Sequence, residues 1–449
     1  MLFNSYQFIF LFFIPTILIY LYIENRFKLL FLIFVSIIFY SMSSVEHLII
    51  LFISILVNYI FAKMIEKNII PKINLILIIL LNLLPLIYYK YSNMFYSRDH
   101  NIVLPLAISF FTFQQIAFQT DIYRKKEKTT SFKDYIFFVL FFPQLVAGPI
   151  IHYRDLIPQV YNTDWGKYRE EYFNIGLMFF SIGLFKKVVI ADNLAPIANL
   201  AFSSIETLSI FTAWQGVLAY TMQIYFDFSG YSDMAIGLAL FFGIKLPINF
   251  NSPYKATNLI EFWRAWHITL SSFLKEHIYI PLGGNRANSL RVSINLMTTM
   301  LIGGIWHGSG LNFLVWGGLH GILLIFLHFI KKRFLMTLPK IISIFITFLS
   351  ISLLWVLFRA DSLNSAIQYY QILFNFHSIS QFNIEVQQLI IIFPLILVWF
   401  FPNSIEISQY LKSKVEFKWY HSAFASLIFF ISLKSLATSP AETFVYFNF

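Results

Sequence analysis

His307 stands in a run of small residues where an ionisable side chain is unusual. The run reads Gly303-Gly304-Ile305-Trp306-His307-Gly308-Ser309-Gly310 and is followed by Trp316-Gly317-Gly318-Leu319-His320-Gly321. Glycines let helices approach closely, or let the backbone break where it lines a cavity. An ionisable residue in an apolar stretch indicates a functional site, so His307 is the first candidate. The alternative is a neutral histidine bonded between helices, and for His320 tight helix packing is favoured.

His267 is the second candidate, in a predicted amphipathic helix over residues 258–279. Asn258 and Glu261 have the spacing of a helix cap, and Pro281 ends the pattern. One face carries Leu259, Trp263, Trp266, Leu270 and Phe273, and another carries Arg264, His267, Ser271 and Lys275. The structural interpretation is an interfacial helix whose polar face lies among lipid headgroups. The functional interpretation is that this face lines a cavity with His267 pointing into it.

Several other chemistries fit the sequence poorly. The chain has no cysteine, which excludes disulfides, thiolate metal sites and an acyl-cysteine. Close histidine pairs with metal-ligand spacing are absent, so no metal is expected. Ser309 does not lie in an esterase elbow, and no phosphate-binding loop is present. Asp227 and Asp233 are the acidic residues expected nearest the membrane interior, where they would orient a histidine or cap helices.

The composition requires that these residues be positioned by membrane helices. Of 449 residues, 58% are hydrophobic and only 12% are charged, and the mean hydropathy is +0.70. Soluble domains have roughly 25% charged residues. A soluble enzyme, a disordered chain and a nucleic-acid binder are therefore excluded, and an all-α polytopic membrane protein is predicted. The net charge of +10 is ascribed to basic residues in cytoplasmic loops.

The apolar segments predict about 11 transmembrane helices, with some shorter ones tilted, re-entrant or paired as half-spans. The candidate spans are 6–23, 27–40, 47–62, 73–89, 102–122, 135–150, 172–190, 209–226, 232–243, 292–306, 312–330, 341–358, 389–401 and 423–436. We expect a single membrane-embedded domain over 1–449, with its functional centre at about 226–321 and an extramembrane loop at 361–386. No fixed-period repeat is visible.

The basic residues of the first loops predict the orientation of the chain. If the N-terminus lies outside, the inside loops hold Arg26, Lys28, Lys63, Lys67, Lys72, Arg124, Lys125, Lys126, Lys128 and Lys133, and the outside loops hold Lys90 and Arg98. Since cytoplasmic loops are enriched in Lys and Arg, an N-terminus outside is favoured.

Five motifs occur in order along the chain: Phe142-Pro143-Gln144-Leu145-Val146-Ala147-Gly148-Pro149, Phe226-Asp227-Phe228-Ser229-Gly230-Tyr231-Ser232-Asp233-Met234-Ala235-Ile236-Gly237, Asn249-Phe250-Asn251-Ser252-Pro253-Tyr254, Phe262-Trp263-Arg264-Ala265-Trp266-His267-Ile268-Thr269-Leu270-Ser271 with Tyr279-Ile280-Pro281-Leu282-Gly283-Gly284-Asn285-Arg286, and Gly303-Gly304-Ile305-Trp306-His307-Gly308. Together they resemble the membrane-bound O-acyltransferase (MBOAT) family, in its alginate O-acetyltransferase branch. The resemblance covers nearly the whole chain.

The resemblance implies a fold and an activity. The fold would place the transmembrane, re-entrant and interfacial helices around a central funnel, with His307 as the catalytic residue at its floor and His267 as a second site residue. The activity would move acetyl groups from cytosolic acetyl-CoA across the bacterial inner membrane. A periplasmic or membrane-anchored partner would then O-acetylate an exported alginate-like polysaccharide or peptidoglycan. Arg264, Lys275 and Arg286 are candidates to attract the phosphates of coenzyme A, or else anchors at the membrane interface.

The chemistry suits a histidine, because its ordinary pKa near 6.5 allows it to accept a hydroxyl proton at neutral pH. Without cysteine, direct transfer between bound donor and acceptor is favoured, and an acyl-histidine stays open. Two alternatives also remain: D-alanyl or lipid acyl transfer within the family, and a small-solute transporter, for which broken helices and a midplane histidine would also be suitable.

Overall fold

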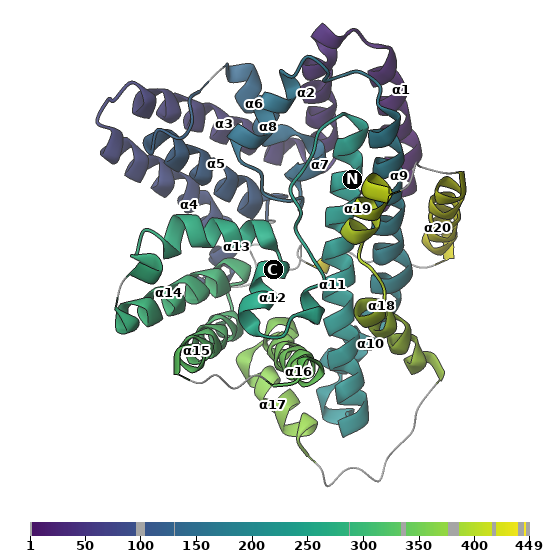
Figure 1. The fold of residues 1–449 in the computed structure, drawn as a ribbon. Helices are drawn as coiled ribbons and strands as arrows, with labels where there is room; N and C mark the ends of the chain where they lie inside the picture. The colour runs from purple at the N-terminus through teal and green to yellow at the C-terminus, as the bar shows by residue number, and fades with distance from the viewer. Residues whose placement is uncertain are drawn as a thin grey trace. The chain divides into compact units, whose positions relative to one another are not determined.

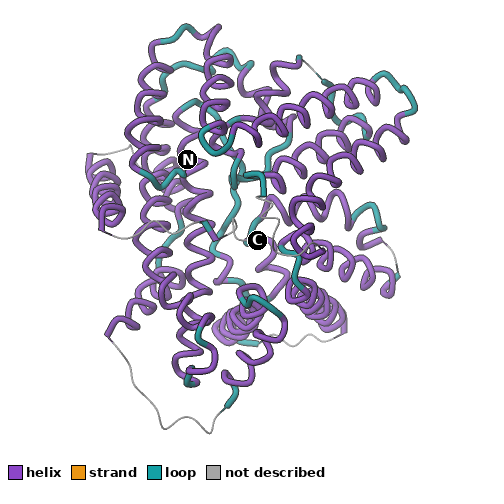
Figure 2. Tube along the Cα trace, turned by 180° about the vertical axis from the view of Figure 1, so that it is seen from behind, coloured by secondary structure: helices purple, strands orange, loops and turns teal. Residues whose placement is uncertain are grey.

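The computed structural model describes residues 2–95, 104–129, 131–286, 288–333, 338–375, 386–414, 419–438 and 444–445. These residues form helices joined by loops, and none of them lies in a strand (Figures 1 and 2). The all-helical fold class is therefore confirmed over the described part of the chain. The helices group into two compact units, each built from segments far apart in the sequence.

The first unit comprises Met1–Gly183, Tyr231–Ile248 and Phe417–Phe429. Its helices are the π-helical η1 (Gln7–Phe13), α1 (Ile14–Tyr22), α2 (Asn25–Ser41), α3 (Val45–Glu66), α4 (Pro71–Phe95), α5 (Ile108–Tyr123), α6 (Phe132–Leu140), α7 (Phe142–Leu145), α8 (Tyr153–Val160) and most of α9 (Glu170–Phe185). An aromatic cluster that includes Phe8, Phe39 and Phe142 fills part of its core. Amide side chains bond within it as well: Asn58 and Asn82 exchange hydrogen bonds of 2.9 Å.

The second unit comprises Leu184–Gly230, Asn249–Glu416 and Phe430–Phe449. It contains η2 (Lys186–Ala191), α10 (Asp192–Ser203), η3 (Ile205–Thr207), η4 (Pro253–Lys255), α12 (Leu259–Ala265), α13 (Ile268–Leu274), η5 (Lys275–Tyr279), η6 (Gly284–Arg286), α14 (Ser289–His307), α15 (Leu311–Arg333), α16 (Lys340–Arg359), α17 (Leu363–Leu373), η8 (Val386–Ile391), α18 (Ile392–Phe400) and α19 (Ser404–Lys414). Three helices, α9, α11 (Ile210–Phe241) and α20 (Trp419–Thr438), contribute to both units.

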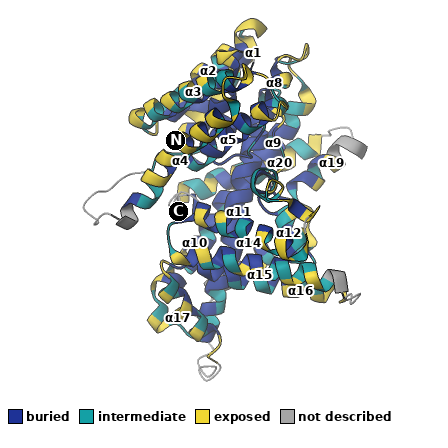
Figure 3. Ribbon diagram, turned by 90° about the vertical axis from the view of Figure 1, so that its left-hand side faces the viewer, coloured by how far each residue is buried: buried dark blue, intermediate teal, exposed yellow. Residues whose placement is uncertain are grey.

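Six helices in the described residues are long and apolar enough to cross a membrane, or seven if one bent pair counts as a span. They are Val45–Glu66, Pro71–Ser92, Glu170–Ser203, Leu311–Ile330, Lys340–Arg359 and Trp419–Thr438, with the bent pair Leu389–Phe400 and Ser404–Tyr410. The polytopic character is thus supported, whereas the expected number of about 11 spans is not confirmed. Helices α3 and α4 carry exposed residues along much of their length (Figure 3), and these include many large apolar ones, as on lipid-facing helices.

The region around Asp227 differs from the expectation. The two predicted spans 209–226 and 232–243 form one continuous helix, α11, which runs from Ile210 to Phe241. Its central residues are almost all buried (Figure 3), although the segment contains two aspartates. A buried charge is tolerated when it is paired, and Asp227 is paired as described below. The polar residues therefore do not interrupt the helix.

The expected loop at 361–386 is partly helical. Helix α17 occupies Leu363–Leu373, where the side chain of Ser362 caps its start by accepting a hydrogen bond from the backbone N–H of Ser365. Residues 376–385 of that expected loop lie outside the described residues.

Candidate active site

His267 lies at a break between two short helices rather than within one long helix. Helix α12 ends at Ala265 and α13 begins at Ile268, and His267 between them has a left-handed backbone with φ of 42°. Histidine is among the non-glycine residues that adopt this conformation most readily. The expectation of one amphipathic helix over 258–279 is therefore wrong. Its predicted start is confirmed, because the Asn258 side chain accepts the backbone N–H of Glu261.

Asn249 fixes the ring of His267 in one tautomer. The Oδ1 atom of Asn249 lies 3.0 Å from Nδ1 of His267 and also accepts the backbone N–H of Thr269. An amide oxygen only accepts hydrogen bonds, so Nδ1 of His267 carries the proton and donates it. Burial lowers the pKa of His267 to about 3, because it disfavours the charged ring. His267 is therefore neutral at physiological pH.

A cavity of about 450 Å³ lies in the second unit. This volume falls in the range of roughly 300–1,000 Å³ typical of small-molecule sites. The polar part of its lining consists of Arg264, Ser271, Lys275, Tyr279, Asn285, Thr299, His307 and His328, and the aromatic part of Trp263 and Trp316. Three of the four residues on the predicted polar face thus line the cavity. The fourth, His267, is fully buried and does not, because the break before α13 reorients its side chain.

His307 lies at the end of α14 and is 4% exposed. Aromatic rings surround it: Trp306 at 4.7 Å, Trp316 at 5.2 Å and Phe358 at 5.0 Å between ring centroids. The ring is therefore held in an apolar cage with one side on the cavity. The indole of Trp306 also lies 6.3 Å from the ring of His267, so it packs against both histidines.

The glycines beside His307 allow α14 and α15 to pack with their backbones in contact. A Cβ atom on Gly304 would collide with the carbonyl oxygen of Phe313 and would lie 3.2 Å from the Cα atom of Gly317. A Cβ atom on Gly317 would collide in turn with the carbonyl oxygen of Met300. Small residues at such crossings are a common device of membrane helices. Here they bring Trp316 of α15 against His307 of α14.

The three basic candidates for phosphate binding differ in whether they line the cavity. Arg264 and Lys275 line the cavity and are exposed, so they form a positively charged rim above the buried His307. Arg286 is exposed as well but does not line this cavity, although its neighbour Asn285 does. The cavity thus has a cationic entrance and a buried histidine, His307, in its lining. A molecule with an anionic part and a reactive group at its other end would suit this arrangement.

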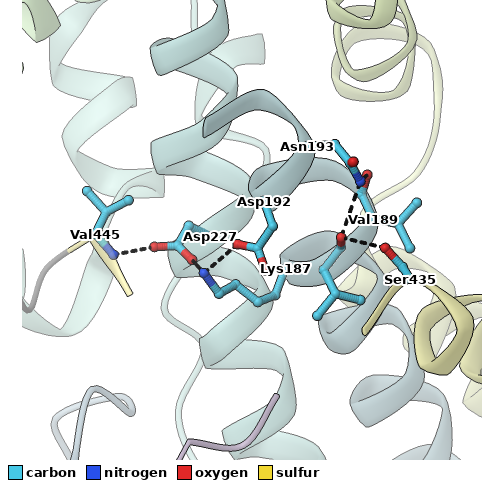
Figure 4. A network of polar contacts seen from close by, with 8 residues as sticks. Lys187, Val189, Asp192, Asn193, Asp227, Ser435 and Val445 are labelled. Atoms are coloured by element: carbon cyan, nitrogen blue, oxygen red, sulfur yellow. Dashed lines mark hydrogen bonds and ion pairs between the residues drawn. The ribbon is translucent and has the colours of Figure 1, made fainter. Parts of the chain in front are cut away.

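A buried ion cluster includes Asp227 of α11 (Figure 4). The Nζ atom of Lys187 lies 2.6 Å from Oδ1 of Asp192 and 2.7 Å from Oδ1 of Asp227. The other oxygen of Asp227 accepts the backbone N–H of Val445 at 2.7 Å. Asp227 therefore bonds a lysine and the C-terminal segment, and it does not orient a histidine as one sequence interpretation had it.

The next residue of α11 connects this cluster to the site. The ring of Phe228 packs edge-on against His267 at 4.6 Å and against Phe444 at 5.5 Å. The ion cluster was missed from the sequence because Lys187 precedes Asp227 by a long stretch and belongs to no local pattern. Its only signal was the pair Lys186-Lys187 in an otherwise apolar segment.

No group of side chains suited to hold a metal occurs among the described residues. The cavity lining itself contains histidine, hydroxyl and cationic groups, which can move protons and bind anions.

Comparison with known proteins identifies the type of enzyme. Residues 72–367 match the model of the MBOAT, membrane-bound O-acyltransferase family. The chain belongs to this family. It is therefore a multi-pass membrane acyltransferase, as the motifs predicted, and the transporter alternative is set aside.

The relatives include enzymes with different acceptors. The chain is 39% identical to the peptidoglycan O-acetyltransferase of Helicobacter pylori, and the match covers 100% of this chain and 98% of the relative. It is 37% identical to the probable alginate O-acetylase AlgI of Pseudomonas aeruginosa, over 84% of this chain and 75% of the relative. A teichoic acid D-alanyltransferase of Bacillus subtilis is 28% identical over 52% of this chain and 61% of its own length.

Proposed function

We propose that this acyltransferase takes acetyl groups from acetyl-CoA in the cytosol and passes them across the inner membrane for O-acetylation of an exported glycan. Peptidoglycan or an alginate-like polysaccharide is the acceptor class. A periplasmic or membrane-anchored partner completes the transfer, and the N-terminus lies on the outer side. The relatives named for O-acetylation of peptidoglycan and alginate support this choice of acyl group and acceptor.

The observation that carries the proposal is the cavity that joins a cationic rim to His307. Coenzyme A has phosphates at one end and the thioester at the other. Arg264 and Lys275 suit the phosphates, since both side chains donate charge-assisted hydrogen bonds. The thioester would then reach the depth of the cavity, where His307 lies among aromatic rings that keep water away.

His307 is the proposed catalytic base. It accepts the proton of the acceptor hydroxyl as that oxygen bonds to the thioester carbonyl carbon. The carbon–sulfur bond then breaks, and the coenzyme A thiolate receives the proton back from His307. Positioned general-base catalysis of this kind contributes roughly 10²–10⁴ in rate. The histidine ends the cycle in its starting protonation state, so transfer needs no further proton donor.

His267 has a positioning role in this proposal. A ring whose pKa is about 3 is a weak base, so it is poorly matched to proton abstraction at neutral pH. Its Nδ1–H bond to Asn249 fixes the turn between α12 and α13. That turn fixes where Arg264 of α12 and Lys275 of η5 lie at the rim.

The test is donor turnover by the full-length protein in proteoliposomes with acetyl-CoA outside. Release of free coenzyme A, with the acetyl group recovered on a hydroxyl acceptor or on the partner protein, is the expected result. Turnover of a D-alanyl thioester and none of acetyl-CoA would instead place the chain with the teichoic acid D-alanyltransferases. Failure of every acyl thioester would overturn the proposed donor.

A further inference from the structure

His320 is a fully buried histidine on α15 that makes one directed polar contact. It is 1% exposed, and its Nδ1 atom lies 3.3 Å from the indole Nε1 of Trp263 on α12. An indole N–H only donates, so Nδ1 of His320 is the unprotonated nitrogen and accepts this bond. His320 is therefore a hydrogen-bond acceptor aimed at one tryptophan.

The indole held by His320 is part of the cavity wall that also contains His307. Trp263 and His307 both line the cavity, and so does Trp316. The Trp316 ring lies 5.9 Å from Trp263, 5.2 Å from His307 and 4.6 Å from His320. The rings of His307, Trp316 and Trp263 thus lie in sequence along one wall of the cavity. The far end of this wall is the hydrogen bond between Trp263 and His320.

We propose that Trp263 limits the length of the acyl group that fits beside His307, and that His320 is the positioning residue that fixes its indole. This inference rests on the proposed function, in which the thioester reaches His307. It deepens that function by assigning the choice of a short acyl group to a particular wall of the cavity.

The hydrogen bond matters because Trp263 is only partly packed. Its ring is half-buried and faces the cavity, so contacts on that side do not fix its rotamer. A single directed bond to a buried acceptor, together with ring packing against Trp316, selects one orientation. Loss of this hydrogen bond allows the indole of Trp263 to rotate. The cavity beside His307 can then accommodate a longer acyl chain. If the side chain of His320 served only for packing, a leucine would suffice. A leucine would also avoid the energetic cost of a polar imidazole in a membrane-spanning helix.

The size of the effect follows from how pockets discriminate methylene groups. One extra methylene against a closed hydrophobic wall changes the specificity constant about 10–200-fold. Butyryl exceeds acetyl by two methylenes, so the wild type should prefer acetyl-CoA to butyryl-CoA by about 100-fold or more in kcat/KM. An opened wall should reduce this preference.

The experiment measures kcat/KM for acetyl-CoA and butyryl-CoA with the full-length protein in proteoliposomes. His320→Leu removes the acceptor, and Trp263→Phe removes the donor while it keeps an aromatic ring. Each should lower the acetyl-to-butyryl preference by at least about 10-fold, the low end of the range for one methylene. The double variant should lower it no further, because both changes break the same bond. His320→Asn, which keeps an acceptor near the Nδ1 position, should retain the wild-type preference within about 2-fold.

Two matched control variants test whether a change in the acetyl-to-butyryl preference is specific to Trp263 and His320. His47→Leu and Trp419→Phe make the same replacements at a position on α3 and at an exposed position on α20, and they should leave the preference unchanged. An unchanged preference in His320→Leu or Trp263→Phe, or additive losses in the double variant, would overturn the inference and leave the proposed function standing. A wild type that turns over no acyl-CoA would overturn the proposed function, and this inference with it. The preference is a ratio within one preparation, so partial misfolding of a variant does not change it.

Discussion

Two adjacent glycines on α14 offer a test of how closely α14 and α15 pack beside His307. A methyl group on Gly304 would collide with the Phe313 carbonyl oxygen and lie 3.3 Å from the Gly317 backbone nitrogen. A methyl group on Gly303 would meet only Leu274 Cδ1, at an ordinary 3.5 Å. The same substitution to alanine therefore introduces a backbone clash at one position and ordinary contact at the next.

The expected difference can be worked from these contacts. Overpacking costs about 1–3 kcal/mol, and a rigid backbone neighbour places Gly304→Ala near the upper end. Alanine gains about 1 kcal/mol over glycine in a helix at either position. Gly304→Ala should therefore lose about 2 kcal/mol of stability, and Gly303→Ala should lose none or gain up to about 1 kcal/mol.

The assay is thermal unfolding in detergent, followed by tryptophan fluorescence. The unfolding midpoint of Gly304→Ala should lie below that of Gly303→Ala by about 3–6 °C. Equal midpoints, or a lower midpoint for Gly303→Ala, would show that the two helices do not meet backbone to backbone at Gly304. The placement of Trp316 against His307 would then have lost its support.

Three further predictions concern charge. Lys187→Met leaves two buried carboxylates without their partner and should lower the stability by about 3–5 kcal/mol. The unfolding midpoint should therefore fall strongly. The control Arg26→Met breaks an exposed ion pair and should change the midpoint little. The pKa of His267 is about 3 in the folded protein and about 6.5 in the unfolded chain. The unfolded state therefore binds more protons between these values, so stability rises with pH up to about 6.5, and His267→Asn should flatten the midpoint profile between about pH 4 and pH 7. Lys275→Gln should raise KM for acetyl-CoA several-fold with little change in KM for S-acetyl-N-acetylcysteamine, which has no phosphates; equal increases would contradict a phosphate role.

Much of the helical architecture could be predicted from the sequence, because long apolar segments admit few other structures. The number of spans could not, since short helices and bent pairs have the same composition as spans. Residues 210–241 illustrate the difficulty. The predicted spans 209–226 and 232–243 left a gap that contains Asp227. A lysine from η2 neutralises this aspartate inside the helix, and that pairing has no local sequence signal.

The candidate site was predicted in part. His307 stood out because its glycines and its charge are unusual in an apolar segment, and the structure places it on a cavity with Arg264 and Lys275. The backbone at His267 was mispredicted as part of one continuous helix, because the apolar residues continue at helical spacing through Trp266 while the backbone turns left-handed at the next residue. Periodicity does not report such a turn when neither glycine nor proline marks it.

The central claim is that His307 is the base in acyl transfer, and it is tested by the turnover of acetyl-CoA by His307→Ala. The measurement compares the rate of coenzyme A release with that of the wild type, in proteoliposomes of equal protein content and at saturating donor. The proposal predicts a loss of roughly 10²–10⁴-fold with the unfolding midpoint retained. A variant that releases coenzyme A as fast as the wild type would contradict it.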